Sequence, residues 1–229
     1  MNNFYKEQEK YYLAIDCIIF GFDKGSLKLL LIKRNFDPCK DKWSLMGGFL
    51  QPDESLNDAA QRILFQLTGL TEIYLEQLNT YGDIERDPAG RVVSAAYYAL
   101  IDAKKYNEIE HQHYTAKWFD INNSPELIFD HNLMVQDALQ RLKEKSQTRP
   151  IGFELLPDKF TIPQLQKLYE AINQMEFDKR NFRKKILSFH ILNRLDEKDK
   201  SGSKKGAYLY QVDEMKYSTM MKDGLLFVV

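Results

Sequence analysis

A polar segment near residue 145 divides this chain into two parts of different pattern and opposite charge. Lys143–Pro150 has no apolar period and ends in proline, which is typical of a linker. Residues 1–140 carry 14 Lys and Arg against 21 Asp and Glu, whereas residues 141–229 carry 18 against 12. We therefore predict two domains, residues 1–147 and residues 148–229, and place any nucleic-acid contact in the second.

The first domain is predicted to combine strands and helices in an α+β order. Tyr11–Phe22 and Leu27–Arg34 are apolar runs around a short polar turn, which predicts a β-hairpin. A helix is expected from Ser55 to Thr68, with Ser55 as its N-cap and Gly69 at its end. The other expected elements are strands at Ile73–Tyr81, Val92–Ile101 and Ala116–Asp120, and a helix over Asn132–Lys145.

Composition narrows the class of protein. With 44% hydrophobic residues, the chain can form two cores and does not fit disorder. Its most apolar early stretch is too short to span a bilayer and is interrupted by Asp16, so we expect a cytoplasmic protein without a membrane partner. Cys17 and Cys39 lack metal-ligand spacing and are interpreted as ordinary thiols.

A glycine turn and the helix that follows it form the best-defined motif of the first domain. Gly48, Glu54, Arg62, Gly69 and Leu70 fit the Nudix box, G-x5-E-x7-R-E-U-x-E-E-x-G-U, without a gap. The preceding segment Trp43-Ser-Leu-Met-Gly-Gly resembles the Trp-x-x-Pro-Gly-Gly entry of that family, with methionine in place of proline. A glycine-rich turn before an ordinary amphipathic helix is the alternative. The resemblance implies a Nudix-fold α/β/α sandwich.

The catalytic part of this box is missing. Ile63, Gln66 and Leu67 stand where Nudix hydrolases carry the glutamates that hold magnesium. Magnesium requires hard oxygen ligands, which isoleucine and leucine do not offer. We predict no diphosphate hydrolysis, no catalytic residue, no bound metal and no cofactor. Glu54 and Arg62 are expected to stabilise the fold, with Glu54 accepting hydrogen bonds from turn amides or pairing with Arg62.

The second domain shows two helices separated by a short break. The first begins at Thr161, with Gln164 at the capping-box position, and the second begins at Asp178 after the break. Phe182, Ile186 and Phe189 share one face of the second helix, which therefore packs inward. The opposite face and its borders offer groups that bind phosphates and base edges: Arg180, Asn181, Arg183, Lys184 and Ser188. This order predicts a helix-turn-helix.

A charged loop containing glycine follows, and it leads into an alternating strand at Tyr208–Val212. Residues 179–205 hold ten Lys and Arg against three acids, which favours contact with phosphates. We predict a DNA-binding wing that uses Lys200, Lys204 and Lys205. A solvated helix followed by a flexible lysine-rich loop is the alternative, but the order of the elements favours a winged helix.

Taken together, residues 10–215 resemble the Nudix-related (NrtR-like) transcriptional regulators. The most specific match is Phe153–Ile172, with its Leu-Leu-Pro, Phe-Thr and Leu-x-x-Leu-Tyr-Glu groups. Arg180–Lys184 and Phe129-Asp130-His131 match further family segments. The resemblance implies a homodimer that binds double-stranded operator DNA through two winged helices and releases it when the Nudix domain takes up a small-molecule effector.

The missing glutamates direct the choice of effector. Because a phosphate effector held by magnesium does not fit them, the sequence resembles the sugar-catabolic branch that includes the arabinose regulator AraR. The predicted function is a repressor of sugar-utilisation genes that responds to L-arabinose. An aromatic face with a few polar groups suits a sugar, and the candidates around the Nudix cleft are Trp43, Tyr81, Asp83, Arg86 and His131.

Several alternatives stay open at this point. The protein could regulate NAD metabolism in response to ADP-ribose, or be a Nudix hydrolase with residual activity. It could also bind RNA or act as a scaffold through its basic helix. The sign of regulation depends on operator position, so an activator also fits the sequence.

Overall fold

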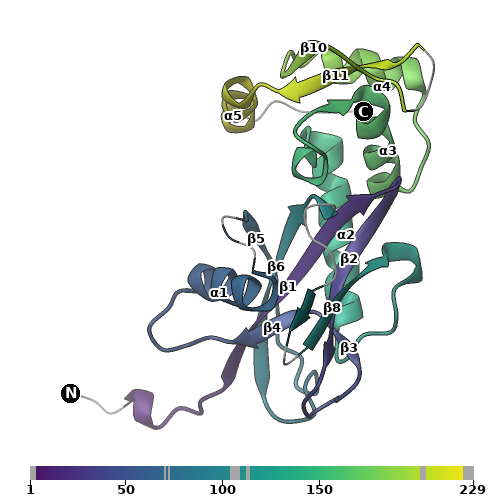
Figure 1. Ribbon diagram of the computed structural model, residues 1–229. Coiled ribbons are helices and arrows are strands. Elements are labelled where there is room, and N and C mark those ends of the chain that lie inside the picture. Colours follow the sequence, from purple (N-terminus) through teal and green to yellow (C-terminus); the bar gives the residue numbers. More distant parts are fainter. Residues whose placement is uncertain are drawn as a thin grey trace.

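The protein consists of two lobes stacked end to end (Figure 1). The computed structural model describes residues 4–69, 71, 73–103, 109–111, 114–201 and 205–223. The first lobe is a mixed sheet between two helices, and the second carries the remaining helices and a small sheet. This arrangement confirms the predicted fold class. Within the described ranges, no helix has both the length and the apolar character needed to span a membrane.

The sheet of the first lobe is built around β1 (Tyr12–Asp23). This strand pairs antiparallel with β2 (Ser26–Arg34), as the hairpin pattern predicts, and parallel with β6 (Val92–Ile101). The strands follow the order β5-β6-β1-β2-β8-β7, with β3 beside β2 and β4 beside β1. Their bounds are β3 Trp43–Ser44, β4 Met46–Phe49, β5 Leu75–Tyr81, β7 Ile109–His111 and β8 Tyr114–Asp120.

Alternating side chains of β1 form two hydrophobic layers, one on each face of the sheet. Ile15 and Ile19 belong to the layer that packs with α1 (Leu56–Thr68), whereas Ile18 and Phe20 belong to the layer that packs with α2 (His131–Thr148). The predicted caps of α1 are present, since Ser55 and Asp58 form a capping box and Gly69 ends the helix at φ 72°. The result is the predicted α/β/α sandwich. Short 3-10 helices lie at Phe4–Lys6 and Ile121–Asn123.

The second lobe has the predicted winged-helix order. After a 3-10 helix at Phe153–Leu155, it contains β9 (Phe160–Thr161), α3 (Ile162–Asn173), α4 (Lys179–Leu187), β10 (Leu192–Asp199), β11 (Ala207–Val212) and α5 (Glu214–Asp223). Thr161 and Gln164 form the expected capping box of α3, and Asp178 caps α4. Its three strands follow the order β10-β11-β9.

Three local predictions differ from the structure. The polar segment 143–150 is largely helical, because α2 continues to Thr148 and buries Leu142 and Ser146 on its inner face. The second helix of the helix-turn-helix, which was predicted to include Phe189, ends at Leu187, and His190 follows with a left-handed φ of 54°. The first part of the loop predicted before Tyr208 is strand β10, so the wing is a longer hairpin than expected.

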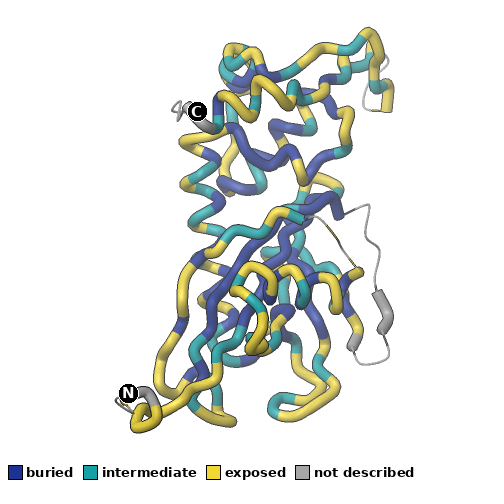
Figure 2. The backbone as a smooth tube through the Cα atoms, turned by 90° about the vertical axis from the view of Figure 1, so that its left-hand side faces the viewer, coloured by how far each residue is buried: buried dark blue, intermediate teal, exposed yellow. Residues whose placement is uncertain are grey.

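The junction between the lobes is packed. Phe22 and Leu27, near the tip of the β1–β2 hairpin, belong to the same hydrophobic cluster as Leu155 and Leu168 of the second lobe. At the far end of α2, the Asn173 side-chain amide donates to Ser146 Oγ at 3.0 Å. Figure 2 shows buried backbone in both lobes and at their junction. A helix and a continuous core therefore join the two lobes.

Candidate effector pocket and DNA-binding surface

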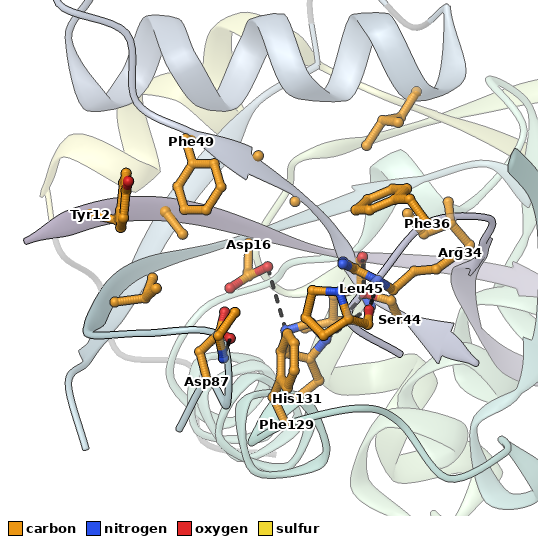
Figure 3. Close-up of a pocket in the computed structure, with 18 of the residues that line it drawn as sticks. Tyr12, Asp16, Arg34, Phe36, Ser44, Leu45, Phe49, Asp87, Phe129 and His131 are labelled. Atoms are coloured by element: carbon orange, nitrogen blue, oxygen red, sulfur yellow. Dashed lines mark hydrogen bonds and ion pairs between the residues drawn. The ribbon is translucent and has the colours of Figure 1, made fainter. Parts of the chain in front are cut away.

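A cavity of about 1220 Å³ lies in the first lobe, between the sheet and the C-terminal end of α1 (Figure 3). Its polar wall comes from β1, β2 and the start of α2, and includes Asp16, Arg34 and His131. Its rim is aromatic and includes Tyr12, Phe36, Phe49 and Phe65. An apolar cavity with a few converging polar groups is the usual form of a small-molecule site.

Two aromatic faces lie on opposite sides of the cavity (Figure 3). On one side the rings of Tyr12 and Phe49 lie 5.4 Å apart, and both side chains are exposed. On the other side the Arg34 guanidinium lies 4.0 Å above the centre of the exposed Phe36 ring. Exposed rings that are positioned by neighbours offer a surface on which a planar group can stack.

A buried charge network forms the floor of the cavity. Asp16 and Arg86 are only 6% and 7% exposed. Arg86 donates two hydrogen bonds to Asp130, at 2.9 and 2.7 Å, and its Nη2 lies 3.6 Å from Asp16 Oδ2. Ser94 Oγ also donates to Asp16 at 2.6 Å. These partners explain how charged groups are tolerated here, since a buried charge without a partner is costly.

His131 connects this network to α2. Its Nδ1 accepts the Leu45 backbone N–H at 3.2 Å, and its Nε2 lies 3.5 Å from Asp16 Oδ1 (Figure 3). Burial lowers the pKa of His131 against the opposing effect of Asp16 and Asp130. Because Nδ1 accepts a hydrogen bond, the ring carries its proton on Nε2, which faces Asp16.

The positions of the missing glutamates do not fit a magnesium ion. Ile63 is buried against Gly48, and Gln66 and Leu67 line the cavity with an amide and an alkyl group. Glu54 has other partners, because it accepts from Arg62 Nε at 2.7 Å and from the Gln51 backbone N–H at 2.8 Å. These bonds are the predicted stabilising contacts. Among the described residues, no cluster of three or more metal-binding side chains is present.

The predicted effector residues divide into two groups. Arg86 and His131 line the cavity. Trp43 lies outside it and packs against Phe119, with ring centres 4.7 Å apart. Tyr81 also lies outside and donates to Asp137 at 2.7 Å, while exposed Asp83 accepts the Glu85 backbone N–H. Strand register turns Trp43 and Tyr81 to other surroundings, and Asp83 lies in the loop after β5. Neither register nor loop placement is visible in a single sequence.

Sequence reasoning missed most of the cavity wall. Asp16 carried a usable signal, since a carboxylate inside an apolar strand requires a buried partner, and Arg86 and His131 supply it. Arg34 and Phe36 belong to no motif in the sequence. They are recognised only when β2 and the following loop are placed beside the cavity.

The basic face of α4 has the predicted orientation. Phe182 and Ile186 are buried, and the Phe182 ring packs against Tyr169 with centres 5.4 Å apart. All five predicted contact residues on this helix and at its C-cap are exposed: Arg180, Asn181, Arg183, Lys184 and Ser188. Lys200 and Lys205 are exposed at the tip of the wing, and Lys204 lies outside the described residues. This geometry suits a helix entering the major groove, with the wing beside it.

Two family models match the chain. The NUDIX domain matches residues 10–137, and the NrtR DNA-binding winged helix domain matches residues 152–212. The chain belongs to the NrtR-like family of Nudix-related transcriptional regulators. Its NrtR-type winged helix makes it a DNA-binding regulator.

Three relatives sharpen this assignment. The chain is 35% identical to the "ADPR responsive transcriptional repressor NtrR" of Acinetobacter baylyi, over 87% of this chain and 81% of that protein. The structure is similar to that of Shewanella oneidensis NrtR with a 27mer DNA, with a TM-score of 0.80 and 26% identity over 94% of this chain and 97% of that one. It is also similar to the NUDIX domain of that protein with ADP ribose, with a TM-score of 0.52 and 28% identity over 62% of this chain and 99% of that one. An ADP-ribose pyrophosphatase of Methanocaldococcus jannaschii is 31% identical over 59% of this chain and 80% of its own length.

Proposed function

We propose that this protein is a transcriptional repressor that responds to ADP-ribose and acts in NAD metabolism. The observation that carries the proposal is a cavity with opposed aromatic faces and charged groups beside a Nudix box that has lost its magnesium ligands. Such a site binds a nucleotide-like ligand but does not cleave it. The ADPR responsive repressor of A. baylyi, and the S. oneidensis structures with DNA and with ADP ribose, support the same conclusion.

The cavity suits both ends of ADP-ribose. An adenine ring can stack on an aromatic face, such as that of the Tyr12–Phe49 pair. Ribose hydroxyls can bond to the polar floor near Asp16 and His131. The prediction of L-arabinose rested on the loss of the metal site, but that loss removes catalysis without removing these binding surfaces. The relatives lend support to ADP-ribose and none to a sugar effector.

On the DNA side, we propose that two copies of the chain bind a palindromic operator through α4 and the wing. The contacts would come from Arg180, Asn181, Arg183, Lys184 and Ser188, with Lys200, Lys204 and Lys205 on phosphates or in the minor groove. ADP-ribose releases the operator if it binds the DNA-incompetent dimer more tightly. A hundredfold drop in operator affinity requires about 2.7 kcal/mol of differential binding.

The test is fluorescence anisotropy of the purified protein on labelled DNA from upstream of its own and neighbouring genes. We expect selective binding to one duplex, release by ADP-ribose, and no release by L-arabinose or other pentoses. A scrambled duplex of equal length is the control. Release by a pentose alone would restore the sugar interpretation, and equal binding to all duplexes would contradict the regulator.

A further inference from the structure

The cavity contains two guanidinium groups in different electrostatic situations. Arg86 is neutralised locally, because it bonds twice to Asp130 and faces Asp16. Arg34 makes no ion pair with any residue in the described part of the chain. Its Nε donates to the Pro38 carbonyl at 3.0 Å, and its plane lies over the Phe36 ring. The guanidinium is thus held in a fixed orientation at the cavity wall.

The α1 side of the cavity carries less negative charge than the same helix in a working Nudix box. In a working Nudix box, several glutamates on α1 face the substrate, and magnesium is needed to offset their repulsion of a diphosphate. Here Gln66 and Leu67 present neutral groups to the cavity, and Glu54 is neutralised by Arg62. Asp16, Asp37 and Asp87 remain as carboxylates of the cavity wall. An anionic ligand therefore requires a cation at this wall, and the described part of the chain offers magnesium no cluster of three or more ligands there.

We propose that the pocket holds the diphosphate of its effector without a divalent cation, and that the Arg34 guanidinium supplies the counter-charge. A planar guanidinium bonds to phosphate oxygens through parallel N–H groups, and stacking on Phe36 restricts its orientation before the ligand arrives. Figure 3 shows Arg34 and Phe36 together, across the cavity from Tyr12 and Phe49. This inference rests on the proposed function, because it assumes an ADP-ribose-like effector.

The test is isothermal titration calorimetry of the full-length protein with ADP-ribose, in EDTA and in excess magnesium. We expect wild-type dissociation constants in the two buffers that agree within about twofold. Arg34→Ala should weaken binding by about 10- to 100-fold, the range for loss of a hydrogen bond to a charged group. Arg34→Lys should fall between the two, because an ammonium keeps the charge without the planar fork.

A matched control is available on the same strand. Lys33 precedes Arg34 on β2, is exposed and lies outside the cavity wall, so Lys33→Ala removes a positive charge without touching the site. It should bind ADP-ribose as wild type does. Adenosine, which lacks the diphosphate, should bind Arg34→Ala and wild type equally. An unchanged melting temperature and operator affinity would show that Arg34→Ala is folded.

The possible failures are distinguishable. Equal ADP-ribose binding by Arg34→Ala and wild type would overturn the role of Arg34. Binding that requires magnesium would overturn the metal-free site. If wild type binds no ADP-ribose in either buffer, the proposed function fails, and this inference fails with it.

Discussion

Helices α1 and α4 are both capped amphipathic helices with basic side chains on their outer faces, yet these side chains have different partners. The one basic side chain of α1, Arg62, is bound by Glu54, with Nη2 and Oε1 2.5 Å apart. In α4, Arg180 and Lys184 are exposed and form no ion pair with a described carboxylate. A cation paired within the protein supports the fold, whereas an unpaired cation on a rigid helix is available to an external anion such as DNA phosphate.

The same contrast holds inside the effector pocket. Arg86 is paired and buried in the floor, while Arg34 is oriented but unpaired at the wall. The cations without an ion-pair partner among the described residues are therefore the candidates for binding an external anion: Arg180 and Lys184 for the operator, and Arg34 for the proposed effector.

The largest effect is expected from the packed face of α4. Phe182 is 2% exposed and contacts the Tyr169 and Phe177 rings. Phe182→Ala should lower the free energy of unfolding by about 3–5 kcal/mol, because it removes a large buried side chain and leaves a cavity. Urea denaturation followed by circular dichroism measures the change. A loss below about 1 kcal/mol would mean that α4 is not anchored as described.

An intermediate effect is expected from the unpaired cations of α4. Arg180→Ala or Lys184→Ala should weaken operator binding by about 1–3 kcal/mol without changing the melting temperature. Lys159→Ala is the matched control, because Lys159 is an exposed cation of the same lobe that is paired with Glu197 at 2.7 Å. It should bind the operator as wild type does. Unchanged affinity in both α4 variants would move the DNA surface elsewhere.

The smallest effect is expected from the paired carboxylate of α1. The hydrogen bond from Arg62 lowers the pKa of Glu54 below its ordinary value of 4.5. A carboxyl with a lowered folded-state pKa contributes stability above its unfolded pKa, and this contribution is lost as the pH falls through the folded value. Glu54→Gln should therefore be less stable than wild type at pH 7, and the difference should shrink below pH 4.5. A difference independent of pH, measured by thermal melts, would contradict the pairing.

The sequence predicted those features that depend on local patterns. The capping boxes at Ser55 and Thr161 marked helix starts correctly, since their hydrogen bonds lie within four residues. The polar end of α2 was taken for a linker because few of its side chains are apolar, although Leu142 and Ser146 are buried by elements distant in the chain.

The DNA-binding surface could be predicted from the sequence more fully than the effector site, which depends on tertiary structure. The exposed face of α4 follows from helical periodicity, and its five residues were predicted together. Trp43 and Arg34 could not be placed in this way, because strand register and loop placement decide which side chains reach the cavity. Trp43 lies outside the cavity against Phe119, whereas Arg34 lines it. The proposed effector differs from the predicted L-arabinose for a chemical reason, since losing the metal ligands leaves the aromatic and charged surfaces of the cavity in place.

The most direct test of the central claim asks whether ADP-ribose releases the operator and is then recovered from the protein without being cleaved. The protein is incubated with operator DNA, magnesium and ADP-ribose at stoichiometric concentration, and operator release is followed by anisotropy. The nucleotide is then recovered and separated by chromatography. The account predicts release of the operator together with unaltered ADP-ribose. Conversion to AMP and ribose phosphate at ordinary enzyme rates would contradict it, because the protein would then be a working Nudix hydrolase.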